Sequence, residues 1–240
     1  MSDLILTKPL KRGDKKGQVR LIQEWLSLRD EQVAIDGDFG PATEAAVKSF
    51  QNGQGLTANG IVDNATFAHL ISPMTDVLKP ITSTGGETLG ELVVAYAKQH
   101  LAQHPREVGG QNRGPWVRLY MEGNEGQQWA WCAGFTCFCL KQACELKGVP
   151  LPINPSFSCD SLASSAKVNN RFVTKDKAGP GSFFLVRNTA TDWTHTGIVI
   201  ESYAEIFRSI EGNTNDEGSR EGYEVCARTR GYKKMDFVKI

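Results

Sequence analysis

The hydrophobic period of this chain changes partway along it, and that change limits the fold more than any other feature. In the first part, apolar residues recur at intervals of three and four, which is typical of amphipathic helices. From residue 181 onward they alternate with polar residues, which predicts strands. The expected strands are 181–187, 193–201, 206–213, 223–230 and 236–240. Because the strands follow the helices as a group, we expect an α+β fold with helices packed on an antiparallel sheet.

Two short helices are predicted near the start of the chain. Val19, Ile22 and Leu26 form a stripe at helical spacing. A second helix is expected to begin at Pro41, because the missing N–H of proline costs nothing in a first helical turn. Gly53 is expected to lie just beyond its end.

A weak internal repeat accompanies these helices. Residues 59–66 resemble residues 36–43 at a spacing of 23. Each copy has an Asp-Gly or Asn-Gly turn, an apolar residue two places after the glycine, and a threonine six places after it. Asp63 is expected to cap a third helix, so the pattern predicts a compact three-helix unit.

The same residues resemble the peptidoglycan-binding type 1 domain, a small three-helix cell-wall module. The resemblance extends from about residue 10 to 70 and implies that this unit binds bacterial peptidoglycan. It leaves the wall-binding residues within 10–70 unassigned, and an alternative is that all the matching residues serve the fold alone. The matching residues are Gly13-Asp14, Val19, Ile22-Gln23, Leu26, the run 36–43, Ala46-Val47, Phe50-Gln51, Gly55-Leu56 and Gly60-Ile61-Val62.

Proline, glycine, serine and threonine gather between the two parts of the chain, where the helical period is lost. We therefore expect a binding domain at 1–72, a linker at 73–87 and a second domain at 88–240. A long amphipathic helix should open the second domain near Thr88 and stop at His104, because proline follows.

The overall charge excludes several partners. The chain has 27 basic and 27 acidic residues, and nucleic-acid binders and polybasic membrane proteins usually carry a basic excess.

Six cysteines in 240 residues are too few for a disulfide scaffold. Without a signal peptide or a long apolar stretch, we expect synthesis in the cytoplasm and action at the cell wall or periplasm after release or secretion.

Cys132 precedes an apolar helical run and is expected to open that helix. Unpaired N–H groups and the positive end of the helix dipole would lower the pKa of its thiol and favour the nucleophilic thiolate. The same N–H groups could hold the oxyanion of a tetrahedral intermediate. His195 opens one predicted strand, and Glu211 and Asn213 close the next. If these strands pair as a hairpin, the three polar residues share an edge, in the order of a thiol hydrolase.

This pattern resembles the CHAP family of cysteine- and histidine-dependent amidohydrolases and peptidases, which has a papain-like fold. The matching residues are Trp131-Cys132-Ala133 with Phe135, the run 195–199 and the run 211–213. Ser182 departs from the family, which usually has Asp there. The resemblance spans about residues 88–240.

The resemblance implies that Cys132 attacks an amide carbonyl and that His195 carries the proton to the leaving amine. Glu211 would orient His195, with Asn213 as a second polar partner and its rival for the third role. Gln128 or Gln127 could supply an oxyanion donor, and Trp131 and Trp129 could line a substrate groove or serve as packing rings. The other cysteines are expected to be packing residues, and their spacing fits no zinc site: Cys137, Cys139, Cys144, Cys159 and Cys226.

Together these features predict a peptidoglycan hydrolase without a metal or cofactor. It would act as an N-acetylmuramoyl-L-alanine amidase or a stem-peptide endopeptidase, either as a phage-type endolysin or as a delivered antibacterial effector. An effector would need an immunity protein. We expect a monomer that binds neither nucleic acid nor membrane. The alternatives are a non-catalytic wall-binding scaffold with an inactive papain-like domain and a thiol transferase or deamidase acting on proteins.

Overall fold

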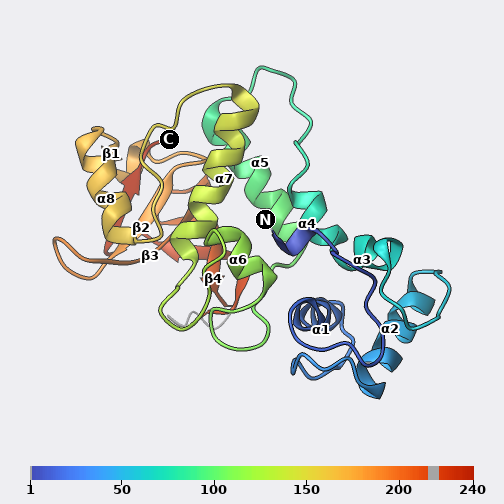
Figure 1. The fold of residues 1–240 in the computed structure, drawn as a ribbon. Helices are drawn as coiled ribbons and strands as arrows, with labels where there is room; N and C mark the ends of the chain where they lie inside the picture. The colour runs from blue at the N-terminus through green and yellow to red at the C-terminus, as the bar shows by residue number, and fades with distance from the viewer. Residues whose placement is uncertain (1, 216–221) are drawn as a thin grey trace. The chain divides into compact units, whose positions relative to one another are not determined.

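The computed structural model describes residues 2–215 and 222–240. Within these residues it has eight α-helices and a six-stranded antiparallel sheet, which confirms the α+β class (Figure 1). The chain divides into two compact units. The first takes the residues up to 78 together with 106–126, and the second takes 79–105 and the residues from 127 on. In the described residues no helix is both long and apolar enough to span a membrane.

The observed units differ from the expected domains in two places. Residues 106–126 cluster with the first unit, although they were expected in the second. The expected linker begins with a helix, α4 (Ser72–Val77), which starts at a serine–proline pair and buries Met74 and Val77. Its proline occupies the first turn, where proline favours a helix instead of interrupting one.

The first unit is built from short helices. Its apolar core includes Trp25, Phe39, Val47 and Leu70, all at most 1% exposed. The expected cap is present, since the Asp63 carboxylate accepts a hydrogen bond from the Thr66 backbone N–H at 2.8 Å. The helices of this unit are α1 (Gln18–Leu28), α2 (Pro41–Gly53), α3 (Asn64–Leu70), α4 and α6 (Pro115–Tyr120), with a 3-10 turn at Ser2–Leu4.

Two buried glutamines explain the internal repeat. Gln23 accepts a hydrogen bond from the Gly37 N–H at 2.7 Å and donates to Asp36 and Thr43. Gln51 accepts from the Gly60 N–H at 2.9 Å, and it donates to the matching Asn59 and Thr66 in the second copy. Each glutamine thus fixes one glycine turn, at a φ of 76° in the first copy and 75° in the second. The sequence repeat is therefore a repeat of buried hydrogen bonds.

Arg118 of α6 joins residues 106–126 to the rest of the first unit by ion pairs. Its guanidinium contacts Asp3 and the almost fully buried Glu24, each at 2.6 Å. On the apolar side, the Trp116 ring meets the Trp25 ring edge-on at 6.0 Å. These partners lie more than ninety positions apart in the sequence, so no local pattern could indicate that they meet.

The second unit contains the sheet, in the strand order β1-β6-β2-β3-β4-β5. The pairing of β3 with β4 is antiparallel, as the predicted hairpin requires. Two short elements, β1 and α8, had no counterpart in the sequence pattern. The strands are β1 (Phe172–Val173), β2 (Phe183–Arg187), β3 (Trp193–Ser202), β4 (Ile206–Thr214), β5 (Glu224–Gly231) and β6 (Met235–Val238). The helices are α5 (Leu89–Ala102), α7 (Cys132–Lys147) and α8 (Cys159–Val168), with a 3-10 turn at Lys175–Lys177.

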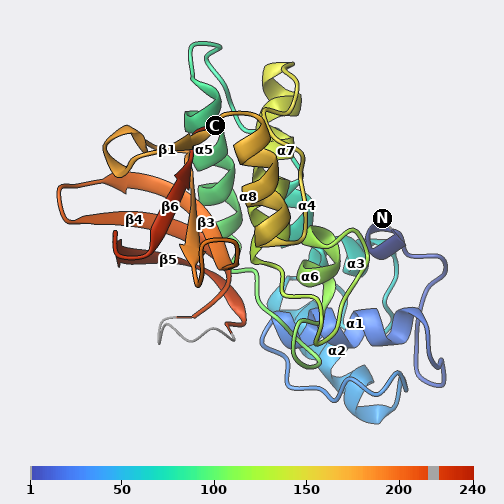
Figure 2. The same cartoon turned by 90° about the vertical axis from the view of Figure 1, so that its left-hand side faces the viewer.

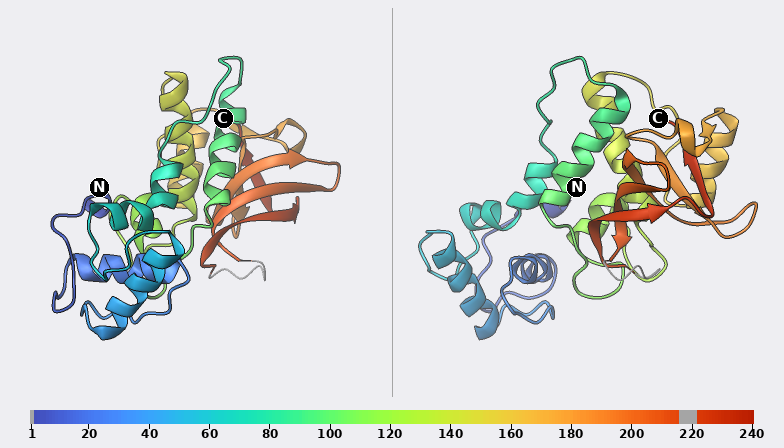
Figure 3. Two further views of the ribbon diagram at one scale, coloured as in Figure 1. Left: turned by 90° about the vertical axis from the view of Figure 1, so that its right-hand side faces the viewer. Right: turned by 180° about the vertical axis from the view of Figure 1, so that it is seen from behind.

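Helices α5 and α7 lie side by side against β3 and β4, and α8 lies against β3 (Figures 2 and 3). Buried His100 of α5 hydrogen-bonds the Gln142 side chain of α7 at 2.9 Å. Burial lowers the pKa of His100 to about 4, so this histidine is neutral at physiological pH. It is a packing residue that joins the two helices.

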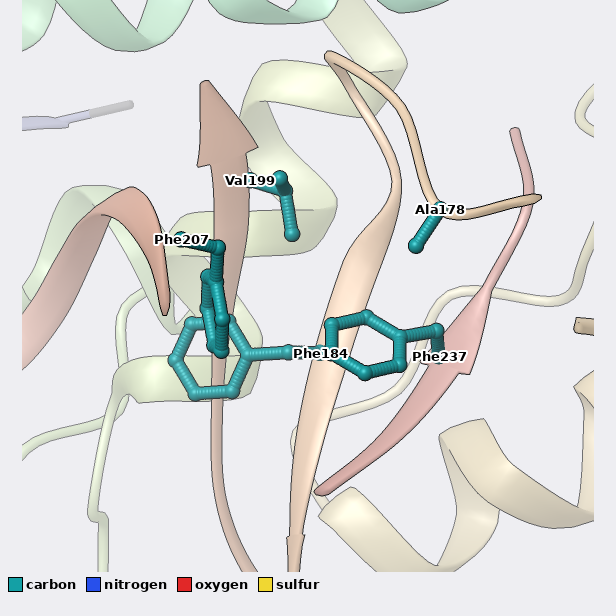
Figure 4. Close-up of a cluster of buried hydrophobic side chains, with 5 residues drawn as sticks. All are labelled: Ala178, Phe184, Val199, Phe207 and Phe237. Atoms are coloured by element: carbon teal, nitrogen blue, oxygen red, sulfur yellow. The ribbon is translucent and has the colours of Figure 1, made fainter. Parts of the chain in front are cut away.

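An apolar cluster of buried side chains packs on the sheet (Figure 4). It consists of Ala178, Phe184, Val199, Phe207 and Phe237, and we call it the Phe184 cluster. Phe184 of β2 pairs with Gly197 of β3, and alternate residues of a strand share a face, so His195 lies on the side of Phe184. The two rings are 6.0 Å apart. Phe184 therefore connects this apolar cluster to His195.

Candidate active site

Cys132 is the first residue of α7, as the sequence predicts. It is 4% exposed, and the Thr196 backbone N–H donates a hydrogen bond to its sulfur. A hydrogen bond from the Cys159 thiol lowers the pKa of Cys132 well below its ordinary value. Burial opposes that effect, whereas the hydrogen bond and positive charge of His195 add to it. The site therefore favours a thiolate at Cys132.

His195 of β3 links Cys132 to Glu211. Its Nε2 lies 2.9 Å from Glu211 Oε2, so the hydrogen bond to Cys132 falls to the other ring nitrogen, Nδ1. Burial alone would lower the pKa of His195, but the hydrogen bonds and charges of Cys132 and Glu211 outweigh burial and raise it to about 9. The imidazole is consequently protonated at neutral pH, and Cys132 and His195 form a thiolate–imidazolium pair.

Glu211 of β4 is fully buried, and Arg230, Ser209 and His195 donate hydrogen bonds to its carboxylate. Arg230 of β5 donates a hydrogen bond to each carboxylate oxygen, from Nε to Oε1 and from Nη2 to Oε2, both at 2.6 Å. The Ser209 hydroxyl donates to Oε1 at 2.5 Å. Burial by itself raises the pKa of Glu211, yet Arg230 and His195 lower it to about 2. The carboxylate therefore stays charged and fixed beneath His195.

Sequence reasoning missed Arg230 and Ser209 as parts of this site. A hint was present, because Arg228 and Arg230 alternate on a predicted strand. The acid that Arg230 contacts depends on the register of β4 against β5, in which Phe207 pairs with Arg230 and Ser209 with Arg228. That register follows from packing, so the sequence alone could not assign the partner.

Cys159 was also missed, since it was expected to be a packing residue. It is the first residue of α8, and its Sγ lies 3.8 Å from Cys132 Sγ. The neighbouring Asp160 accepts a hydrogen bond from the Trp193 N–H at 2.7 Å, which ties the start of α8 to the start of β3. Two helix N-termini thus bring two thiols together beside His195.

Asn213 follows Glu211 on β4 but does not reach His195. It lies at an irregularity in the pairing of β4 with β5 and has a φ of 53°. Across the described chain, no hydrogen bond joins Asn213 to His195, whereas Glu211 makes one. The geometry therefore favours Glu211 over Asn213 as the partner of His195.

The residues before α7 divide into exposed and buried ones. Gln127 and Gln128 are exposed, and partly exposed Trp129 meets the Phe157 ring edge-on at 6.2 Å. Trp131 is fully buried, so it packs the core and offers no surface to a substrate. Of the two roles expected for Trp131, substrate groove or packing ring, its burial therefore favours the packing ring.

Two glycines allow the strands to approach the site closely. A Cβ on Gly197 would lie 2.8 Å from Glu211 Cγ, and one on Gly212 would lie 2.7 Å from the Phe135 Cβ of α7. Real Cβ atoms essentially never come this close. Any larger residue would push Glu211 away from β3 or α7 away from β4.

This arrangement can perform nucleophilic chemistry on a carbonyl group. A thiolate at a helix N-terminus, an imidazolium beside it and a fixed carboxylate supply a nucleophile, a proton donor and an orienting group. The first-turn N–H groups of α7 can stabilise negative charge on a substrate oxygen.

Comparisons with known proteins match the N-terminal part of the chain. Residues 15–70 match the family described as "Putative peptidoglycan binding domain". The zinc D-Ala-D-Ala carboxypeptidase of Streptomyces albus G is 48% identical over 56 residues, which are 23% of this chain and 22% of that protein. Residues 15–70 therefore match a peptidoglycan-binding family, and the resemblance expected for this part of the chain is confirmed.

One solved structure also shows a local similarity to this chain. The crystal structure of the Burkholderia AP3 phage endolysin aligns with 24% identity over 45% of this chain and 41% of its own, with a TM-score of 0.27.

Proposed function

We propose that the chain is a modular cell-wall hydrolase that cleaves an amide bond of peptidoglycan with Cys132 as nucleophile. The observation that carries the proposal is the chain of hydrogen bonds from Cys132 through His195 to Glu211. The peptidoglycan-binding domain at residues 15–70 supports the choice of substrate. The resemblance of residues 88–240 to the CHAP family supports the reaction type.

In the proposed reaction, the Cys132 thiolate attacks the carbonyl carbon of a wall amide. The oxyanion is held by the first-turn N–H groups of α7. His195 gives its proton to the leaving amine as the C–N bond breaks, which leaves an acyl thioester on Cys132. The neutral imidazole then takes a proton from water, and the resulting attack on the thioester releases the acid and restores the thiolate–imidazolium pair.

Glu211 acts in this scheme as the positioning residue. It holds the imidazole by Nε2 and stabilises the protonated form. Because Arg230 and Ser209 occupy its remaining lone pairs, the carboxylate can neither rotate nor take up the proton at neutral pH. Either the lactyl–alanine amide or an amide within the stem peptide fits this chemistry, in a phage-type lysin or in a delivered effector.

Digestion of purified peptidoglycan tests the proposal. The intact chain should release new amino groups, and mass spectrometry of the fragments names the bond that is cut. Cys132→Ala should abolish release while the thermal unfolding transition remains. Cys144→Ala is the matched control, because this buried thiol lies on the same helix and contacts Pro150 instead of the site. Full turnover by Cys132→Ala would overturn the mechanism, and wall binding by the intact chain without any release would favour the non-catalytic scaffold.

A further inference from the structure

Cys159, at the start of α8, takes no step in the hydrolysis just described, although its thiol lies beside the Cys132 sulfur at the start of α7. Cys132 Sγ and Cys159 Sγ lie 3.8 Å apart, and both residues are less than a tenth exposed. A disulfide needs about 2.05 Å between the sulfurs, so a closure of roughly 1.8 Å is required. Rotation of the two side chains with a small shift of the helix starts can supply it. Cys159 is thus within reach of Cys132, on which the proposed reaction depends.

We infer that Cys132 and Cys159 are an oxidation site, which a hydroperoxide converts to a reversible disulfide that blocks the nucleophile. The formation of the bond follows from the geometry of the two thiols. The effect of the disulfide on activity rests on the proposed function, because Cys132 is the nucleophile only in the proposed hydrolysis.

The chemistry balances with the groups present and one hydroperoxide. The Cys132 thiolate attacks the hydroperoxide, an S–O bond forms as the O–O bond breaks, and the leaving alkoxide or hydroxide takes the proton of His195. The Cys159 sulfur then attacks the Cys132 sulfenic acid. The S–S bond forms as the S–O bond breaks, and the departing hydroxide leaves as water with the Cys159 proton. The two sulfurs lose two electrons, and the peroxide is reduced to an alcohol (or water) and water.

The environments of the two sulfurs suit this order of events. The first attack needs a thiolate, and the helix N-terminus, the Thr196 N–H and His195 favour one at Cys132. Cys159 donates its thiol proton to Cys132, and this hydrogen bond raises the pKa of Cys159 well above its ordinary value. Cys159 therefore stays protonated until Cys132 has been oxidised and the hydrogen bond is gone. By contrast, burial raises the pKa of Cys139 on the same helix, which makes that thiol a poor nucleophile.

The experiment treats the intact chain with hydrogen peroxide and maps its disulfides by mass spectrometry after alkylation. The expected product is one linked peptide pair, 132 with 159, lighter by two hydrogens. Alkylation of Cys132 by iodoacetamide should be lost and should return with dithiothreitol. In Cys159→Ser the peroxide should carry Cys132 on to sulfinic acid, which dithiothreitol does not reverse. Cys144→Ser is the matched control and should still form the bond.

Each outcome bears on the inference separately from the proposed function. A map without the 132–159 pair, or full recovery of Cys159→Ser by dithiothreitol, overturns the inference whatever the wall activity is. The linked pair in a chain that digests no peptidoglycan supports the oxidation site and refutes the hydrolase. If Cys159→Ser loses its fold, Cys159→Ala in the same mapping and alkylation assay replaces it.

Discussion

Replacing Glu211 by glutamine tests whether its charge holds the proton on His195. The change keeps the shape of the side chain and removes one negative charge 2.9 Å from Nε2. Two unit charges about 4 Å apart attract by roughly 4 kcal/mol at an effective dielectric constant of about 20. At about 1.4 kcal/mol per pKa unit, this attraction corresponds to a fall of about three units in the pKa of His195. We expect a decrease of roughly one to three units from the value of about 9.

The pH profile of wall digestion measures this decrease. Deprotonation of His195 removes the proton that the leaving amine needs, so the alkaline limb of the profile reports its pKa. In the unchanged chain the midpoint of the alkaline limb of the digestion rate should lie near pH 9. In Glu211→Gln it should move to roughly pH 6–8, and the rate at neutral pH should fall with it.

The matched control is Glu201→Gln on the same strand as His195. Glu201 is exposed and pairs with Tyr203 and Arg208 away from the site, so its loss should leave the limb in place. Thermal unfolding of both variants shows whether the fold persists. An unmoved alkaline limb in folded Glu211→Gln would refute the assignment of Glu211 as the group that holds the proton on His195.

Three further predictions concern stability. Gly212→Ala should lower the free energy of unfolding by about 1–3 kcal/mol, because its Cβ meets α7, whereas Gly231→Ala, with nothing within 4 Å, should change it by less than about 0.5 kcal/mol in urea titrations. Gln51→Ala should cost about 1–3 kcal/mol, because it leaves the buried Gly60 N–H unpaired, and the melting of the first unit reports it. Because the folded-state pKa of Glu211 is lowered from 4.5 to about 2, its ionisation stabilises the fold above pH 4.5, and that stability is lost as the pH falls through 2. As the pH falls from 4.5 toward 2, below the range in which His195 titrates, the stability difference between the unchanged chain and Glu211→Gln should therefore shrink by up to about 3 kcal/mol. Equal slopes for the two chains in this acid range would contradict the prediction.

Local patterns were sufficient for the elements that carry the candidate site. The start of α7 at Cys132 follows from an apolar helical run, and the strand of His195 follows from alternation. The antiparallel hairpin then places Glu211 beside His195. The sequence repeat likewise predicted both glycine turns of the first unit. These features depend on neighbours within one element or one hairpin, where spacing along the chain translates directly into distance.

The chain pattern by itself therefore determined the α+β class, the resemblance of the first unit to a peptidoglycan-binding domain, and the order of cysteine, histidine and acid. Only the tertiary structure decided that Arg230 clamps Glu211 and that Cys159 meets Cys132. The first contact needs the register of two strands, in which a shift by one residue turns every side chain to the other face. The second needs two helices, separated by a loop, to start at the same point. Such contacts are fixed by packing between elements, which no local spacing in the sequence encodes.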